Sequence, residues 1–256
     1  MIPYDFHIHT EYCGHAAGMT VEVICRRAEE MKLETIAITD HIYDNNSAGV
    51  IEKIRRDLKQ AAPTLPVVIG AEVDVNADFI DGRLASNLLD GIDYLVAGFH
   101  YVPTAGNYPW KPQDCNLDET MFMRYWESTL LGIVSNQRIN TLAHPGRLLA
   151  AAIGPKVDWS AAMEVFKKAA KLSAKNRIAW EINELTGKRL LPEFQEKWHE
   201  IYAIALDAGV KLIFGSDAHE PPAIAEATFS ETLLAKLPAG SLSSPQEVLE
   251  WKRSLP

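Results

Sequence analysis

The sequence has few cysteines, no long apolar run and no export signal. Its three cysteines, Cys13, Cys25 and Cys115, form no Cys-x-x-Cys pair, and this odd, scattered set favours a reducing compartment, most simply the cytoplasm. No apolar run approaches the roughly 18 residues that a membrane span needs. The first residues lack a basic region followed by an apolar one, so no signal peptide is expected. We therefore predict a cytoplasmic protein without a membrane partner.

Positive charge is scarce as well, because 25 Lys and Arg residues stand against 34 Asp and Glu residues and leave a net charge of −9. Nucleic-acid duplexes are bound by neutralising many phosphates, so an extended nucleic-acid surface is not expected. A single phosphate in a pocket remains compatible with this charge, since bound divalent cations make a cleft locally positive. The sequence contains neither a Gly-x-Ser-x-Gly elbow nor a P-loop. Nothing in it predicts an oligomeric state.

Short β-like runs alternate with longer amphipathic segments along the chain, without a second composition regime. This alternation predicts one α/β domain, residues 1–256, built as a βα barrel or an open doubly wound sheet. A barrel is favoured because almost every expected strand ends in His, Glu or Asp, and βα barrels build their sites at carboxyl-terminal strand ends. The expected strands are residues 3–9, 35–39, 66–75, 94–100, 140–144, 177–183 and 211–216.

Helix starts are also visible. Thr20, Asp118 and Asp158 are expected N-caps, and residues 244–247 (Ser-Pro-Gln-Glu) match a capping box with proline at the first helical position. Residues 194–205 show helical apolar spacing and predict one helix. The segment 101–116, rich in aromatic residues, departs from this rhythm and is expected to pack on the rim or to cover a substrate, with packing preferred. The stretch after Glu220 is expected to complete the same domain.

Histidines are concentrated at the expected strand ends. His7 and His9 lie two apart, so in a strand both imidazoles point to one side; taken alone, this pair fits a metal site or an ordinary exposed or buried pair equally well. The one histidine in an expected helix, His199, is expected at the surface. Segregation of the rest favours a metal site, whose candidate ligands are His7, His9, His15, His41, Glu72, His100, His144, Asp217 and His219.

The ligand types suit zinc, manganese or iron, since imidazoles accompany carboxylates. Nine ligands exceed the about four that one zinc ion takes, so we expect two or three ions with Glu72 as a bridge. Asp5 and Asp40 adjoin ligands and are expected to orient imidazoles or to be solvated. Glycine precedes a ligand by two positions at Gly70, Gly98 and Gly215, where the missing side chain leaves room beside the ion.

These nine residues, in order and type, resemble the metal-binding positions of the PHP (polymerase and histidinol phosphatase) metallophosphoesterases. The resemblance spans residues 5–219 and implies a distorted TIM-like barrel of seven βα units with a trinuclear centre. It assigns His7, His9, Glu72 and Asp217 to one ion. It assigns Glu72, His100 and His144 to a second, and His15, His41 and His219 to a third. Within the set, Asp217 and His219 are our candidate catalytic residues.

The function predicted from this resemblance is hydrolysis of a small phosphate monoester by a metal-bound hydroxide, with histidinol phosphate or a nucleotide-type compound as substrate. Arg147, three residues after His144, is the candidate phosphate contact, or else forms an exposed salt bridge; Lys188 and Arg189 are weaker candidates. An amidohydrolase-like deacetylase or deaminase also begins with His-x-His, but typically uses fewer ligands and a carboxylated lysine. A non-catalytic metal-binding module is the third alternative.

Overall fold

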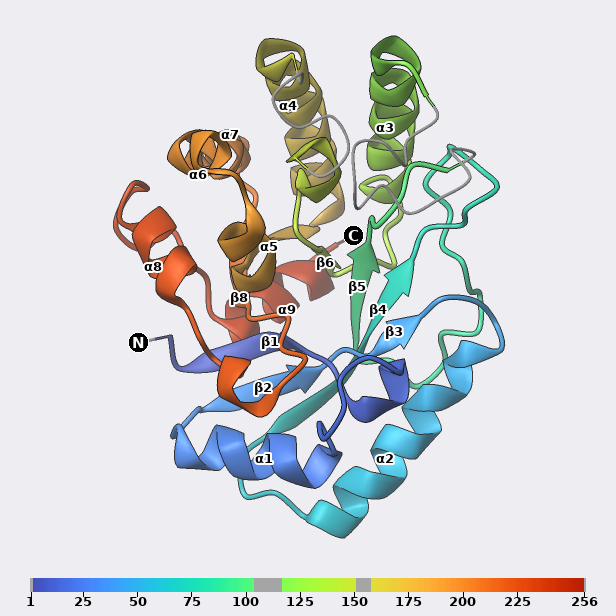
Figure 1. Ribbon diagram of the computed structural model, residues 1–256, viewed down its shortest axis with the longest axis vertical. Coiled ribbons are helices and arrows are strands. Elements are labelled where there is room, and N and C mark those ends of the chain that lie inside the picture. The colour runs from blue at the N-terminus through green and yellow to red at the C-terminus, as the bar shows by residue number, and fades with distance from the viewer. Residues whose placement is uncertain (1, 104–116, 151–157, 256) are drawn as a thin grey trace.

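A parallel sheet, rolled until its first and last strands nearly meet, organises the molecule (Figure 1). The computed structural model describes residues 2–103, 117–150 and 158–255. Every strand pair in the sheet is parallel, and the order follows the chain from β1 to β8, with β3 attached to β4 off the main path. The strands are β1 (Tyr4–Ile8), β2 (Thr35–Ile38), β3 (His41–Ile42), β4 (Val67–Asp74), β5 (Tyr94–Gly98), β6 (Thr141–Leu142), β7 (Ala179–Asn183) and β8 (Leu212–Gly215).

The sheet closes only at its carboxyl-terminal end. There the Asp217 amide donates to the His7 carbonyl at 2.8 Å, and the His9 amide donates to the Ala218 carbonyl at 3.0 Å. A single isolated bridge, between Ile8 and Ala218, joins the β1 side to the β8 side among the described residues. The predicted distorted TIM-like barrel is thus confirmed, and all seven predicted strands are present. The two-residue strand β3 was not predicted.

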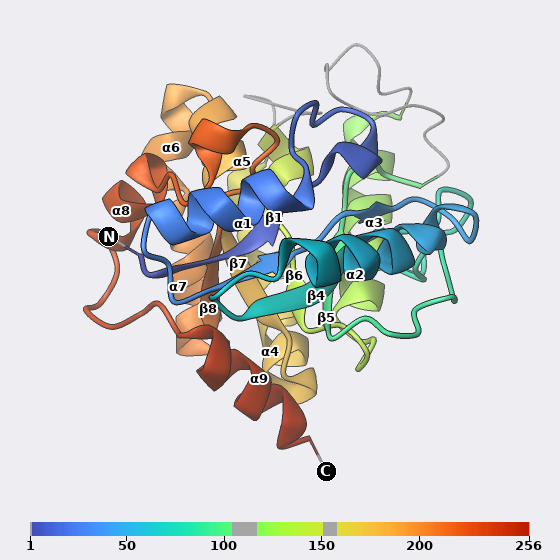
Figure 2. The same cartoon turned by 90° about the horizontal axis from the view of Figure 1, so that it is seen from below.

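Helices surround the sheet, with α1 and α2 packed side by side beneath it and α4 packed between α3 and α7 (Figures 1 and 2). Thr20, Asp118 and Asp158 cap their helices as predicted, and Ser244 with Glu247 forms the predicted capping box. The helices are α1 (Val21–Glu30), α2 (Val50–Ala61), α3 (Glu119–Ile133), α4 (Trp159–Asn176), α5 (Glu184–Arg189), α6 (Pro192–Lys197), α7 (His199–Asp207), α8 (Thr228–Leu234) and α9 (Pro245–Arg253).

The predicted single helix over residues 194–205 is divided at Trp198 into α6 and α7, although Trp198 keeps helical backbone angles. Its predicted apolar face is buried. No helix in the described part of the chain is both long and apolar enough to cross a membrane. Most of the irregular segment 101–116 lies outside the described residues, as does Cys115.

Apolar side chains fill the amino-terminal end of the barrel and leave its other end to polar groups. Phe6 meets Tyr94 edge-on with ring centroids 5.1 Å apart, and both belong to a buried cluster that also contains Phe214. Val248 of α9 joins this cluster, so the last helix covers the same end. Because that end is packed with apolar groups, the histidines and carboxylates at the carboxyl-terminal strand ends face a single shared space.

Candidate metal centre

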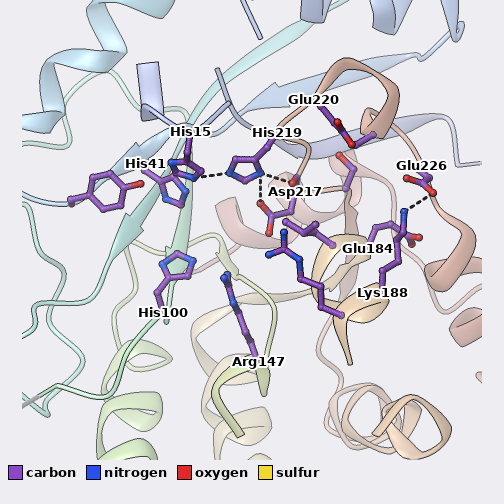
Figure 3. Close-up of a pocket in the computed structure, with 15 residues that line it drawn as sticks. His15, His41, His100, Arg147, Glu184, Lys188, Asp217, His219, Glu220 and Glu226 are labelled. Carbon is purple, nitrogen blue, oxygen red and sulfur yellow. Dashed lines mark hydrogen bonds and ion pairs between the residues drawn. The ribbon is translucent and has the colours of Figure 1, made fainter. Parts of the chain in front are cut away.

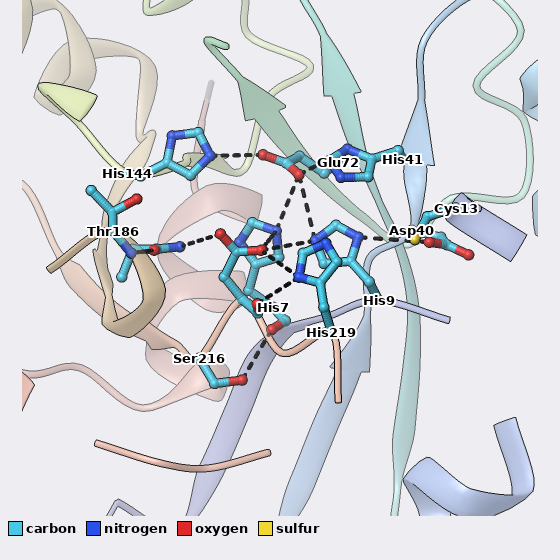
Figure 4. A network of polar contacts seen from close by, with 12 residues as sticks. His7, His9, Cys13, Asp40, His41, Glu72, His144, Thr186, Ser216 and His219 are labelled. Atoms are coloured by element: carbon cyan, nitrogen blue, oxygen red, sulfur yellow. Dashed lines mark hydrogen bonds and ion pairs between the residues drawn. The ribbon is translucent and has the colours of Figure 1, made fainter. Parts of the chain in front are cut away.

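All nine predicted ligands meet at the carboxyl-terminal end of the barrel (Figures 3 and 4). Each lies on a strand or in the loop that follows one, and eight come from positions within four residues of a strand end. His15 is the outlier, since it follows the short 3-10 helix Glu11–Cys13. His199, by contrast, lies at the start of α7 with its Nδ1 at 3.0 Å from the Glu196 carbonyl, as expected for a residue outside the site.

Glu72 on β4 is the centre of the arrangement, with a different group of imidazoles at each carboxylate oxygen. Its Oε1 lies 2.9 Å from His144 Nε2 and 3.1 Å from His100 Nε2. Its Oε2 lies 3.1 Å from His41 Nδ1 and 3.3 Å from His7 Nε2. Burial raises the pKa of this carboxyl, but the charges of His100 and His7 outweigh it and hold the pKa well below its usual value. Glu72 is therefore an anion that joins several imidazoles.

Strand β3 explains how His41 reaches this centre. His41 pairs with Glu72 in the parallel register of β3 and β4, so the two side chains leave neighbouring positions of the same sheet. Burial and the charge of His9 lower the pKa of His41 well below its usual value. His41 is consequently a neutral imidazole with a free lone pair, which is the form that binds metal.

Asp217 supplies the second carboxylate of the cluster. Its Oδ1 lies 3.1 Å from His9 Nε2 and 3.8 Å from His7 Nε2. The backbone at Asp217 and at His144 has positive φ values of 59° and 31°. Non-glycine residues in this region cost of order 1–3 kcal/mol, and such strain is concentrated at functional sites. The fold thus holds two members of the cluster in conformations that a free chain avoids.

The outer edge of the cluster is formed by His15, His41 and His219. The Nε2 atoms of His15 and His219 lie 3.0 Å apart, too close for two unshared lone pairs unless a proton or a cation lies between them. Burial, reinforced by the charge of His9, lowers the pKa of His219 to about 4. His219 Nδ1 lies 2.9 Å from the Asp217 carbonyl, and His15 Nδ1 lies 3.1 Å from the Cys13 carbonyl.

Two buried acids that the sequence interpretation did not include orient the inner imidazoles. Glu181 on β7 lies 2.6 Å from His7 Nδ1 and also accepts from the His144 amide at 2.8 Å. Asp74 on β4 lies 2.6 Å from His100 Nδ1. A carboxylate on one ring nitrogen fixes the tautomer and aims the other nitrogen at the ion. Glu181 carries a sequence signal, because it is an acid in the middle of the largely apolar strand β7, whereas Asp74 is the last residue of β4, two positions after Glu72.

The predicted orienting roles of Asp5 and Asp40 differ in outcome. Asp40 Oδ1 lies 3.6 Å from His9 Nδ1, facing the ring as predicted. Among the described residues, Asp5 forms no hydrogen bond or ion pair with an imidazole; it accepts from the backbone amides of Ser216 and Ala225, both at 2.9 Å. Asp5 therefore braces the loop that carries Asp217 rather than a ring.

The prediction that three glycines leave room beside the ion also holds for some of them and not for all. A Cβ at Gly98 would lie 2.6 Å from His100 Cε1 and 2.8 Å from Glu72 Oε1, and one at Gly215 would strike the Glu181 carboxylate. Gly70 instead faces the Thr39 side chain and the Tyr94 carbonyl, each at 2.8 Å from such a Cβ. Gly98 and Gly215 make room for the cluster, whereas Gly70 makes room for strand packing.

The residues present fit divalent metal ions. Several buried polar atoms form no hydrogen bond with any described residue, a state that costs about 1–3 kcal/mol per atom if it is left uncompensated. A cation would compensate them, and mixed imidazole and carboxylate donors suit a transition metal. These atoms include His7 Nε2, both ring nitrogens of His9, His41 Nδ1, His144 Nδ1 and Glu72 Oε2.

A cavity of about 570 Å³ opens beside the cluster (Figure 3). Arg147 lines it, with its Nη1 at 3.4 Å from His144 Nε2. Lys188 and Arg189 from the end of α5 line it too, although Lys188 Nζ is paired with Glu226 at 2.7 Å. The three predicted substrate contacts thus share one cavity with the outer histidines.

A βα barrel with a histidine- and carboxylate-rich cluster at its carboxyl-terminal end defines a class of proteins built to hold metal ions. Within that class, the family model described as PHP domain matches residues 5–185, and the chain belongs to this family. The resemblance inferred from the nine residues is thereby confirmed.

Similar proteins agree with this assignment. The chain is 24% identical over 227 residues to the Escherichia coli protein named probable phosphatase YcdX, covering 86% of this chain and 79% of that one. Its fold is similar to the crystal structure of histidinol phosphate phosphatase from Lactococcus lactis complexed with zinc, L-histidinol and phosphate. That match has a TM-score of 0.68 at 16% identity and covers 92% of this chain and 93% of the other.

Proposed function

We propose that this protein is a metal-dependent phosphatase that hydrolyses a small phosphate monoester. The observation that carries the proposal is the convergence of imidazoles on both oxygens of buried Glu72, beside a cavity lined by arginine. Bound divalent cations supply positive charge for the phosphoryl oxygens and lower the pKa of water, so that hydroxide is available near neutral pH. Zinc, manganese and iron all suit these donors.

The proposed division of the ligands is the one that the family resemblance implies, and most of the distances agree with it, although His41 of the third group also lies 3.1 Å from Glu72 Oε2. His7, His9 and Asp217 form one group, joined to Glu72 through its Oε2. His100 and His144 form a second on Glu72 Oε1. The third group is His15, His41 and His219. In this proposal the centre is trinuclear, and Asp217 and His219 lie where the first and third groups adjoin.

The chain's own residues prepare the site before substrate binds. Glu181 accepts from His7 Nδ1 and Asp74 from His100 Nδ1, so the Nε2 lone pairs of both rings are directed at Glu72 and its surroundings. Arg147, half-buried at the cavity wall, is placed to bind phosphoryl oxygens through its planar guanidinium group. Hydrolysis then breaks the bond between phosphorus and the ester oxygen. The water oxygen joins phosphorus, and the departing alkoxide takes up a proton.

Histidinol phosphate and nucleotide-type phosphates are the proposed substrate candidates. The matched Lactococcus lactis structure, which contains L-histidinol and phosphate, supports the first of them. The cytoplasmic location stays a prediction from the cysteines, of which Cys13 and Cys25 are free thiols.

The test is a phosphate-release assay on protein reconstituted with zinc, manganese or iron. The panel contains histidinol phosphate, nucleoside monophosphates and nucleoside 3′,5′-bisphosphates, with amide substrates scored for ammonia or acetate. We expect phosphate release that disappears on chelation and returns with added metal. Turnover of amides with no phosphate release would instead favour the amidohydrolase alternative, and no turnover would favour a non-catalytic module.

A further inference from the structure

The wall of the cavity opposite the outer histidines carries three cations. Arg147 follows β6, whereas Lys188 and Arg189 form the last turn of α5. The cavity of about 570 Å³ is far larger than one phosphate group needs and lies within the roughly 300–1,000 Å³ typical of ligand pockets. Its outer part must therefore accommodate the remainder of a substrate, beyond the phosphoryl group.

Most of the acids in the same wall are already engaged. Glu226 is paired with Lys188 at 2.7 Å. Buried Glu184 accepts from the backbone amides of Phe229 and Ser230 at 2.8 and 2.9 Å, so its charge stabilises the start of α8. In the described part of the chain, Arg189 has no ion-pair partner.

Arg189 and Arg147 line the same cavity, and their two charges interact. Burial lowers the pKa of the Arg147 guanidinium, the carboxylates of Asp217 and Glu72 raise it, and the positive charge of Arg189 lowers it. Two neighbouring guanidinium groups attract anions between or beside them, and planar guanidinium suits carboxylate and phosphate alike. The remaining acid, Glu220, is exposed and lies near His219, across the cavity from Arg147 (Figure 3).

We propose that Arg189 binds a second anionic group of the substrate while Arg147 binds the phosphoryl group that is removed. This inference rests on the proposed phosphatase function and specifies its substrate class: phosphate esters that also carry a carboxylate or another phosphate. Histidinol phosphate, whose second charged group is a cationic amine, fits this wall less well. Arg189 is thus a specificity-determining residue.

Matched pairs of esters test the proposal. 3-Phosphoglycerate has a carboxylate where glycerol 3-phosphate has a hydroxymethyl group, and adenosine 3′,5′-bisphosphate has one phosphate more than adenosine 3′-monophosphate. For at least one pair, kcat/KM should favour the more anionic ester by about three- to tenfold, a modest factor because Arg189 is exposed. Arg189→Gln should remove that preference by raising KM more for the more anionic ester than for the less anionic one, while Arg189→Lys should retain part of it.

Arg138→Gln is the matched control, because this exposed arginine precedes β6 at the opposite end of the barrel and changes the net charge equally. The preference should survive in this variant. Equal kcat/KM values within both pairs, or a loss of preference in Arg138→Gln as large as in Arg189→Gln, would overturn the subsite while leaving the phosphatase function standing. Absence of phosphate release from every ester by the metal-loaded protein would overturn both.

Discussion

The inner and outer halves of the candidate metal centre are built differently. The inner cluster, defined as His7, His9, Glu72, His100, His144 and Asp217, is buried, and its rings at His7 and His100 are held by the carboxylates of Glu181 and Asp74. The rim cluster, defined as His15, His41 and His219, is held at His15 and His219 by backbone carbonyls, and His15 is exposed.

This difference predicts unequal metal affinities. A carboxylate that accepts from a ligating imidazole raises the basicity of that imidazole and fixes its orientation. A backbone carbonyl in a loop carries less charge and is held less rigidly, so its effect on the imidazole is weaker. The inner ions should therefore exchange slowly and the rim ion quickly. The protein would then keep part of its metal under conditions that remove the rest.

The largest effect is expected from Glu72→Gln, which breaks the inner cluster at its centre. The neutral amide brings no negative charge to the centre of the cluster, and several imidazoles lose their common anionic partner. Changes to orienting residues alone cost 10–100-fold in metal affinity or activity, so we expect phosphate release to fall by at least about 100-fold. Metal analysis after dialysis checks the cause; a variant with a full metal complement and near-normal activity would refute the bridging role.

Glu181→Gln should have the next largest effect, because it weakens the inner cluster without removing a ligand. The neutral amide still reaches His7 and the His144 amide, but it no longer favours one tautomer through charge. We expect a loss of about 10–100-fold in affinity for the inner ions. Competition with a fluorescent chelator measures it, and Lys168→Gln, which alters only an exposed pair with Glu127, is the control.

His15→Ala should affect the rim alone. Its ring contacts His219, the Cys13 carbonyl and the ring of His41, and among the described residues it makes no direct contact with Glu72. We expect loss of one metal equivalent with the inner ions retained, and about a tenfold loss of activity. If all metal left together, the two clusters would be one indivisible site and the comparison would fail.

Proton release on metal binding is the smallest expected effect, and it distinguishes the inner cluster from the rim cluster by the charge of their imidazoles. In the metal-free protein burial opposes protonation of His100, but Glu72 and Asp74 outweigh it and raise the pKa to about 9, and the pKa of His7 is raised well above its usual value. Both rings are therefore protonated at pH 7 and must lose protons to bind metal. His41, His144 and His219 have lowered pKa values and are already neutral.

Calorimetric titration of metal at pH 7, in buffers of different ionisation enthalpy, measures these protons. We expect release from His7 and His100 during filling of the inner cluster and none from His41 and His219 during filling of the rim. Because the raised pKa of His100 is about 9, the release should decline as the pH rises through that value. Equal release in both phases would contradict the assignment of charge to the inner rings.

The strands and the ligands were predictable from sequence because both follow local patterns. Residues 66–75 form an apolar run that ends in acids, and the structure places β4 there with Glu72 near its end. Strand β3 was not predicted, because two residues carry no periodicity; only pairing with β4 defines it. The division at Trp198 was likewise invisible, since the residues on both sides keep helical spacing.

The supporting acids of the site were missed for a different reason. Glu181 and His7 are separated by 174 positions, and no local pattern connects residues that only barrel closure brings together. A buried acid in the apolar segment Ala179–Asn183 does demand a partner, which is the signal that an interpretation of the sequence can use. Asp5 shows where this signal fails to identify a side-chain partner. Its partners are backbone amides, which every sequence supplies and no side-chain pattern reveals.

Chelator-driven metal release followed together with phosphatase activity tests the central claim most directly. We expect two or three transition-metal equivalents per chain, with the rim ion lost first and the inner ions later, and phosphate release restored when metal is returned. Protein that binds no transition metal, or that hydrolyses phosphate esters equally well with every ion removed, would contradict it.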